Sequence, residues 1–194
     1  MSAATLAQVQ RITAACVPAQ AWRNGGGQTR ELLVWPAQGD WQLRISRADI
    51  DRDGPFSAFP QVERWFAVLR GRGVALAFQD GERTLRAEDD ALCFDGAAAP
   101  GCRLLDGPTQ DLNLMLRGGT GTLCRWQAGR RWDASFAMRG LYTAVAGRWS
   151  GSTGTLDVAA DTLLWSAAAA PGAWDFEARA PGAGAWWLGY TPRD

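Results

Sequence analysis

The groups in this chain that could do chemistry are limited first by two residue types that it lacks. The 194-residue sequence contains no histidine, and all twenty of its basic residues are arginine, so lysine is missing as well. The usual acid–base group at neutral pH and the usual Schiff-base nucleophile are therefore absent. Carboxylates, four cysteines and two tyrosines remain. Without histidine, and with no visible carboxylate cluster, we predict no transition metal and no cofactor.

Polar side chains with hydrogen-bonding power alternate with apolar ones in three short segments. In a strand, alternate residues share a face. The segments "WQLRIS", "TRELLVW" and "DLNLML" then carry three polar stripes: Gln42, Arg44 and Ser46; Thr29 and Glu31 with Leu33 and Trp35; and Asp111 and Asn113 with Met115. These stripes face either water or the inside of a barrel. A buried Arg44 would need a carboxylate, either from a ligand or from Glu31 or Asp111.

A barrel lined by arginine, hydroxyl, amide and aromatic groups would suit a small anion with a flat or apolar body. The planar guanidinium of arginine grips a carboxylate at two points. The inward arrangement of the stripes therefore predicts a small anionic metabolite as the partner.

The segments that carry these residues are predicted to be β-strands. Glycine and proline recur about every ten residues, and the short apolar runs between them are typical of an antiparallel all-β sandwich or barrel. The chain is 47% hydrophobic, enough for one domain or two small ones. The charge is balanced, which argues against nucleic acid as a partner. No apolar run reaches the roughly 20 residues of a membrane span.

Localisation is predicted from the N-terminus and from the cysteines. The first twenty residues lack the pattern of a secretory signal, and the four cysteines show no CxxC spacing. A reducing compartment suits such cysteines. We therefore expect a cytoplasmic protein that does not contact the membrane.

The "NGGG" stretch, residues 24–27, raises the question of a phosphate-binding loop. A Walker-type loop needs lysine and then serine or threonine, but Gln28 follows and the chain has no lysine. The segment after the glycines also reads as a strand and not as a helix. We interpret the stretch as a hairpin in which Asn24 and Gly25 adopt positive φ, while Gly26 and Gly27 allow close backbone approach.

Five motifs occur in a fixed order between Trp22 and Arg117: "WRNGGGQTRE", "WQLRIS", "DGPFSAFP" followed by Arg64, "VLRGRG" and "DLNLM". In this order they resemble the HutD/Ves family. The resemblance implies a cupin (RmlC-like) jelly roll duplicated as a bicupin, with a first barrel at 1–118 and a degenerate second barrel at 119–194. The family is associated with bacterial histidine utilisation, where a regulatory role through binding N-formylglutamate or urocanate has been proposed; other members are described as stress-induced.

The resemblance also implies which residues contact a ligand. Carried over onto the matching positions, they are Asn24, Thr29, Glu31, Arg44, Ser46, Phe56, Ser57, Phe59, Arg64, Asp111 and Asn113.

Three functions remain open at this point. The first is a metal-free binding protein for a small carboxylate metabolite. The second is a metal-independent isomerase, epimerase or hydrolase with Glu31 or Asp111 as general base, which would need a carboxyl pKa raised by burial, whereas a neighbouring Arg44 would lower it. In the third, the polar stripes are buried networks that stabilise the fold, and the exposed face of the second barrel forms a homodimer or binds a partner.

Overall fold

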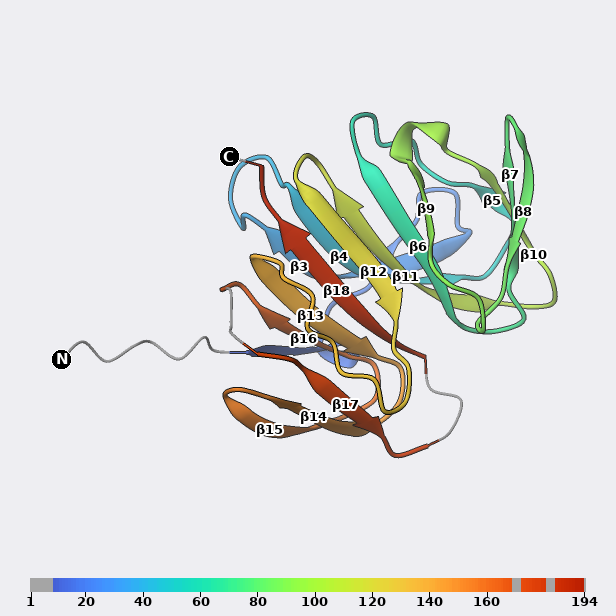
Figure 1. The fold of residues 1–194 in the computed structure, drawn as a ribbon. Coiled ribbons are helices and arrows are strands. Elements are labelled where there is room, and N and C mark those ends of the chain that lie inside the picture. The colour runs from blue at the N-terminus through green and yellow to red at the C-terminus, as the bar shows by residue number, and fades with distance from the viewer. Residues whose placement is uncertain (1–8, 169–171, 181–183, 194) are drawn as a thin grey trace. The chain divides into compact units, whose positions relative to one another are not determined.

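The computed structural model describes residues 9–168, 172–180 and 184–193, and its regular structure is almost entirely β-strand (Figure 1). The all-β prediction is confirmed. The helical elements in these residues are two 3₁₀ turns, η1 (Ala14–Cys16) and η2 (Gly96–Ala98). Within the same ranges, no helix has the length and apolar character needed to cross a bilayer.

Contacts between Cα atoms divide the chain into two compact units. One spans Val17–Thr120 and carries all the motifs, so we call it the motif unit. The other, which we call the Trp-rich unit, contains β1 (Gln10–Thr13), η1 and the strands after Gly121. The expected boundaries placed residues 10–16 in the first barrel, but β1 pairs antiparallel with a strand of the Trp-rich unit, from Gln10 opposite Trp165 to Thr13 opposite Thr162. β1 therefore belongs to a sheet of the Trp-rich unit, and a local reading of the sequence does not reveal this because the pairing is long-range.

The motif unit consists of two antiparallel sheets. The larger has the order β2 (Gln20–Ala21), β3 (Gly27–Trp35), β4 (Leu43–Ile50), β11 (Thr109–Leu116), β6 (Glu63–Arg70) and β9 (Leu92–Asp95). The smaller has the order β5 (Gly54–Pro55), β10 (Gly101–Leu104), β7 (Val74–Phe78) and β8 (Gly81–Leu85). Side chains of both sheets form one apolar core that includes Ile50, Phe66, Val68, Val74, Leu76 and Cys102. The two sheets therefore pack face to face, as in a jelly-roll sandwich.

The Trp-rich unit also has two antiparallel sheets. The first has the order β1, β16 (Thr162–Ser166), β13 (Met138–Thr143), β18 (Ala185–Thr191) and β12 (Thr120–Arg125); the second has β15 (Gly154–Val158), β14 (Gly147–Gly151) and β17 (Asp175–Ala178). Its core is built from indole rings. Trp132 stacks on Trp187 at 5.4 Å between ring centroids, and Trp149 meets Trp174 edge-on at 5.1 Å. Many of the tryptophans therefore contribute apolar surface to the core.

A β-bulge in β3 changes which side chains share a face. Glu31 lies opposite Ser46 of β4, but Leu33 lies opposite Ile45, because the register shifts between Glu31 and Leu33. Directly opposed residues share a face. Leu33 and Trp35 therefore lie on the face opposite Glu31, and the predicted stripe is wrong beyond Glu31. An extra residue in a strand inverts every side chain that follows it.

The glycine stretch forms the turn between β2 and β3. Gly25 has φ +69°, whereas Asn24 does not have the predicted positive φ. Asn24 instead accepts a hydrogen bond from the Gly26 backbone N–H at 3.0 Å through its Oδ1. A Cβ at Gly27 would lie 2.2 Å from the backbone oxygen of Asp49. The close approach predicted for Gly27 is thus confirmed, and it is made to strand β4.

Candidate ligand-binding site

The motif unit contains a cavity of about 550 Å³ between the β2–β3 hairpin and the inner face of the larger sheet. All the candidate residues except Glu31 and Asp111 line it: Asn24, Thr29, Arg44, Ser46, Phe56, Ser57, Phe59, Arg64 and Asn113. The volume is in the range of small-molecule sites. Residues far apart in the chain are therefore brought to one concave surface.

The polar stripes of β4 and β11 face this cavity and not bulk water. Asn113 lies opposite Ser46 on one side and Phe66 on the other, and Met115 lies between Arg44 and Arg64. Ser46 and Asn113 are each only 3% exposed. The other face of the same strands carries buried leucines and an isoleucine: Leu43, Ile45, Leu112, Leu114 and Leu116.

Arg64 is a buried cation at the cavity wall, and it is 7% exposed. Its Nε and Nη2 both donate to Asn113 Oδ1, at 3.0 and 2.7 Å. Its guanidinium also lies over the Phe56 ring at 4.2 Å and over the Phe94 ring at 5.5 Å. Among the described residues, no carboxylate forms an ion pair with it. Burial first, and then the charge of Arg44, lower the pKa of Arg64 to about 9.

Arg44 differs from Arg64 because its charge is compensated. Its Nε lies 2.8 Å from Glu31 Oε2, and the two side chains are 18% and 34% exposed. The contact is an ion pair and not a hydrogen bond, because the Nε–H finds no acceptor in bonding geometry. Of the two carboxylates proposed as partners for Arg44, the structure therefore pairs Glu31 with it. Glu31 itself lies outside the cavity lining.

Asp111 shares the inner face of β11 with Asn113 but lies deeper, between Ala48 and Val68. It is 0% exposed, and its Oδ2 accepts a hydrogen bond from Thr109 Oγ1 at 2.8 Å. Its Oδ1 has no hydrogen-bond partner in the described part of the chain. Burial raises the pKa of Asp111 well above its usual range, against the opposing effects of the Thr109 hydrogen bond and the charge of Arg64. Asp111 forms no ion pair with Arg64, although its charge acts to raise the pKa of that arginine.

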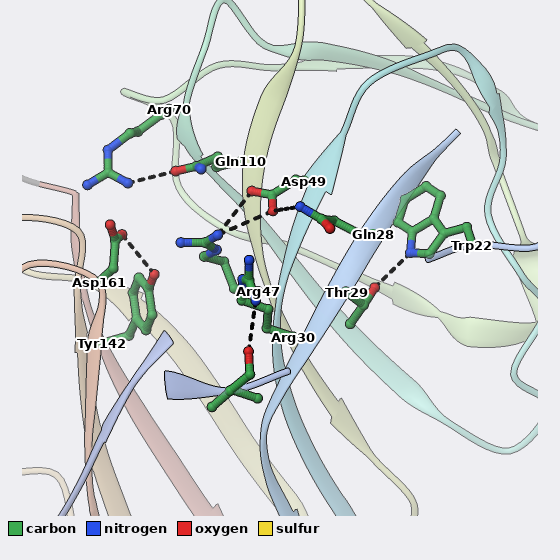
Figure 2. A network of polar contacts seen from close by, with 11 residues as sticks. Trp22, Gln28, Thr29, Arg30, Arg47, Asp49, Arg70, Gln110, Tyr142 and Asp161 are labelled. Atoms are coloured by element: carbon green, nitrogen blue, oxygen red, sulfur yellow. Dashed lines mark hydrogen bonds and ion pairs between the residues drawn. The ribbon is translucent and has the colours of Figure 1, made fainter. Parts of the chain in front are cut away.

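The hairpin with the glycines is tied to the cavity wall by Trp22. The indole Nε1 donates to Thr29 Oγ1 at 2.8 Å, as Figure 2 shows. Trp22 also packs against the core of the motif unit. This contact holds the Asn24 turn beside the cavity.

The opposite face of the larger sheet carries a separate polar network, which is drawn in Figure 2. Asp49 accepts hydrogen bonds from Gln28 Nε2 at 3.0 Å and from Arg47 Nη2 at 3.2 Å, and Arg70 donates to Gln110 at 2.6 Å. Gln28, Arg47, Asp49 and Gln110 alternate with residues of the cavity face, and the register shift at Gln110 puts Arg70 on their side. They are consequently not part of the candidate site.

A divalent metal does not fit this cavity. Its polar lining offers three guanidinium groups, three side-chain amides and hydroxyls, and the chain contains no histidine. In the ranges that the structure describes, no three residues of the metal-binding types His, Cys, Asp and Glu gather into a cluster. Guanidinium groups repel cations and attract anions. The donor set therefore selects against a metal ion.

Sequence reasoning missed several lining residues, among them Trp22, Arg23, Ala48, Ile50, Phe66 and Met115. A signal existed for some of them. β4 continues past Ser46 to Ile50, so the alternation that joins Arg44 and Ser46 extends to Ala48 and Ile50. In β6, the same alternation puts Phe66 on the face of Arg64. Phe94, which packs on Arg64, comes from the edge strand β9 and carried no such signal.

Together, the two face-to-face sheets and the inward-facing arginines define a cupin-like β protein with a cationic cavity. A model of the HutD family matches residues 14–186. The chain belongs to the HutD family, and the predicted resemblance is confirmed.

Two relatives each match more than half of this chain. The chain is 34% identical over 112 residues to an uncharacterized 21.2 kDa protein in the hutC 3′ region of Pseudomonas putida, a match covering 57% of this chain and 59% of that protein. It is 32% identical over 137 residues to Protein Ves of Cronobacter sakazakii, covering 69% and 74% of the two chains.

Among solved structures, a conserved protein of unknown function from Pseudomonas aeruginosa PAO1 has a TM-score of 0.84 at 27% identity and covers 95% of this chain and 99% of its own. HutD from Pseudomonas fluorescens SBW25 has a TM-score of 0.84 at 22% identity, covering 96% and 100%. The cupin-type protein Ylba from Escherichia coli has a TM-score of 0.71 at 9% identity, covering 98% and 93%. The cupin-like fold class is confirmed.

Proposed function

We propose that this chain is a metal-free binding protein that holds a small carboxylate metabolite in the cavity of the motif unit, with a regulatory role in histidine utilisation. Its family relation links it to histidine utilisation. The observation that carries the binding proposal is the uncompensated charge of the buried Arg64.

A buried cation without a counter-ion is costly, so such a group needs an anion when its site is filled. Arg64 has five N–H donors, of which two are used by Asn113. A carboxylate at the remaining donors would supply the missing charge and form charge-assisted hydrogen bonds. Phe56 and Phe59, which also line the cavity, would cover an apolar or flat body. N-formylglutamate and urocanate are the types of metabolite that we propose.

The proposal is tested by thermal unfolding and calorimetric titration with N-formylglutamate, urocanate and their amides. A ligand at about 100 times its Kd should stabilise the protein by about 2.7 kcal/mol, which raises Tm by roughly 5 to 10 °C for a chain of this size. At the same ligand concentration, Arg64→Met should reduce the shift to about a third or less, and the fully amidated form of each acid should not cause it. Arg103→Gln is the matched control, because Arg103 forms an exposed ion pair with Glu82 away from the cavity. The proposal fails if neither acid moves the wild-type midpoint.

One observation favours a metal-independent enzyme as a second candidate. A general base of this kind needs a raised carboxyl pKa, and burial raises that of Asp111. Glu31 is less suited, because it is paired with Arg44. The test follows bound metabolite by NMR over time: turnover that Asp111→Asn abolishes while binding is retained would support the enzyme. An unchanged metabolite spectrum would rule this candidate out for the compound tested.

A further inference from the structure

Two of the three arginines that line the cavity, Arg44 and Arg64, differ in how much of their charge is left for a ligand. Arg44 and Arg64 flank Met115 on the inner face of the larger sheet, one on each neighbouring strand. With two strand spacings between them, their Cα atoms are roughly 10 Å apart. A ligand with a chain of four or five carbons can therefore contact both. Glu31 neutralises Arg44 at 2.8 Å, whereas no carboxylate of the described residues pairs with Arg64.

The two arginines also differ in how many N–H donors remain free, and here Arg44 has more than Arg64. Two of the N–H groups of Arg64 donate to Asn113. Arg44 makes no hydrogen bond within the described ranges, and its ion pair with Glu31 lacks bonding geometry. Arg44 thus offers free N–H donors but little net charge, and Arg64 offers the charge.

The charge count of the cavity follows from these pairings. The Arg44–Glu31 pair sums to zero, the serines and Asn113 are neutral, and Arg64 contributes one positive charge. Arg23 also lines the cavity, but it is exposed, so water and salt screen its charge. One negative charge balances this site.

We propose that Glu31 sets the number of negative charges that the cavity accepts, so that the site selects a monocarboxylate with a neutral hydrogen-bond acceptor at its far end over a dicarboxylate of equal size. The carboxylate of such a ligand pairs with Arg64, and the neutral acceptor receives hydrogen bonds from Arg44. A second carboxylate at Arg44 would compete with Glu31 and would be repelled by it. This inference rests on the proposed function, because it concerns the same cavity. Of the two metabolite types proposed there, it favours urocanate, which carries one carboxylate, over N-formylglutamate, which carries two.

The experiment compares succinamate with succinate, two probes of nearly equal shape that differ by one charge, in calorimetric titrations at pH 7. Wild type should bind succinamate about tenfold more tightly than succinate, the order expected for one like-charge contact at a partly exposed site. Glu31→Gln should release the charge of Arg44, so the preference should vanish or reverse toward succinate. Glu82→Gln, which removes an exposed glutamate from the ion pair with Arg103, is the matched control and should keep the wild-type ratio.

A second variant tests the role assigned to Arg44. Arg44→Gln leaves Glu31 without its partner, so both probes should bind more weakly and succinate should lose more affinity than succinamate. The inference alone is overturned if wild type binds succinamate but Glu31→Gln keeps the wild-type ratio, or if wild type prefers succinate. If wild type binds neither probe, nor any metabolite in the thermal series, the proposed function is overturned and this inference falls with it.

Discussion

Replacing Arg64 with methionine should change stability and binding in opposite directions. Methionine keeps an unbranched side chain of similar length and removes the charge. In the ligand-free protein, Arg64 is a cation held in a buried site with only the amide of Asn113 and two phenyl rings as neighbours that stabilise it. Removing it should relieve the folded protein of a desolvated charge and should at the same time remove the group that attracts a carboxylate.

The size of the stability effect follows from the pKa of Arg64. Burial and the charge of Arg44 lower it from 12.5 to about 9, and each pKa unit is worth about 1.4 kcal/mol, so the charge costs the folded state about 5 kcal/mol. Because the folded-state pKa of this base is lowered, the full cost is present below pH 9 and decreases only above it. Against this, Asn113 Oδ1 loses its donors, which costs about 1–3 kcal/mol, and two cation–π contacts cost about 0.5–1 kcal/mol each.

Arg64→Met should therefore raise the free energy of unfolding of the ligand-free protein by about 0–3 kcal/mol at pH 7, or Tm by up to roughly 10 °C. Binding of a carboxylate should weaken by about 30-fold or more, because loss of one partner of a buried charge pair costs about 2–5 kcal/mol. Urea denaturation and calorimetric titration of both proteins measure the two effects. A variant that is clearly less stable than wild type would refute the reasoning, since it would mean that the charge of Arg64 is compensated within the fold.

Two further predictions concern stability. Burial raises the pKa of Asp111, so its contribution to folding stability is complete below the unfolded-state pKa of a carboxyl and is lost as pH rises toward the folded-state value. Between pH 4 and 8, the Tm of Asp111→Asn should therefore fall less than the Tm of wild type. Parallel curves of Tm against pH would contradict the shift. Gly27→Ala should destabilise the protein by several kcal/mol, because its Cβ would clash with the Asp49 backbone oxygen. Gly25→Ala has open space and only a positive φ of 69° to oppose it, so thermal unfolding should show a loss of about 1–2 kcal/mol. Equal losses at the two glycines would show that close approach is not what requires Gly27.

Much of the fold class and part of the candidate site could be predicted because they depend on local periodicity. The alternation in "DLNLML" separates Asn113 from Leu112 and Leu114, and the structure places them on opposite faces of β11. The alternation of β4 likewise predicts that Arg44 and Ser46 share a face, and both line the cavity. The period of a strand is contained in the residues themselves, so no tertiary information is needed.

Other features depended on pairings between distant segments. The sequence named two carboxylates as partners for Arg44 without deciding between them; the sheet register places Glu31 beside it and buries Asp111 elsewhere. The bulge in β3 moves Leu33 to the other face, which no count of alternate residues reveals.

By itself, the sequence determined which chemistries are available: without histidine and lysine, recognition relies on arginine, amides and hydroxyls. It also determined which residues of each strand share a face, because that is a property of the extended backbone. Only the tertiary structure decided which charges are compensated. Arg64 meets the Asn113 amide across 49 positions of the chain and finds no carboxylate there, whereas Arg44 finds Glu31. Compensation depends on distances between strands that are remote in sequence, and these distances are set by sheet register and packing.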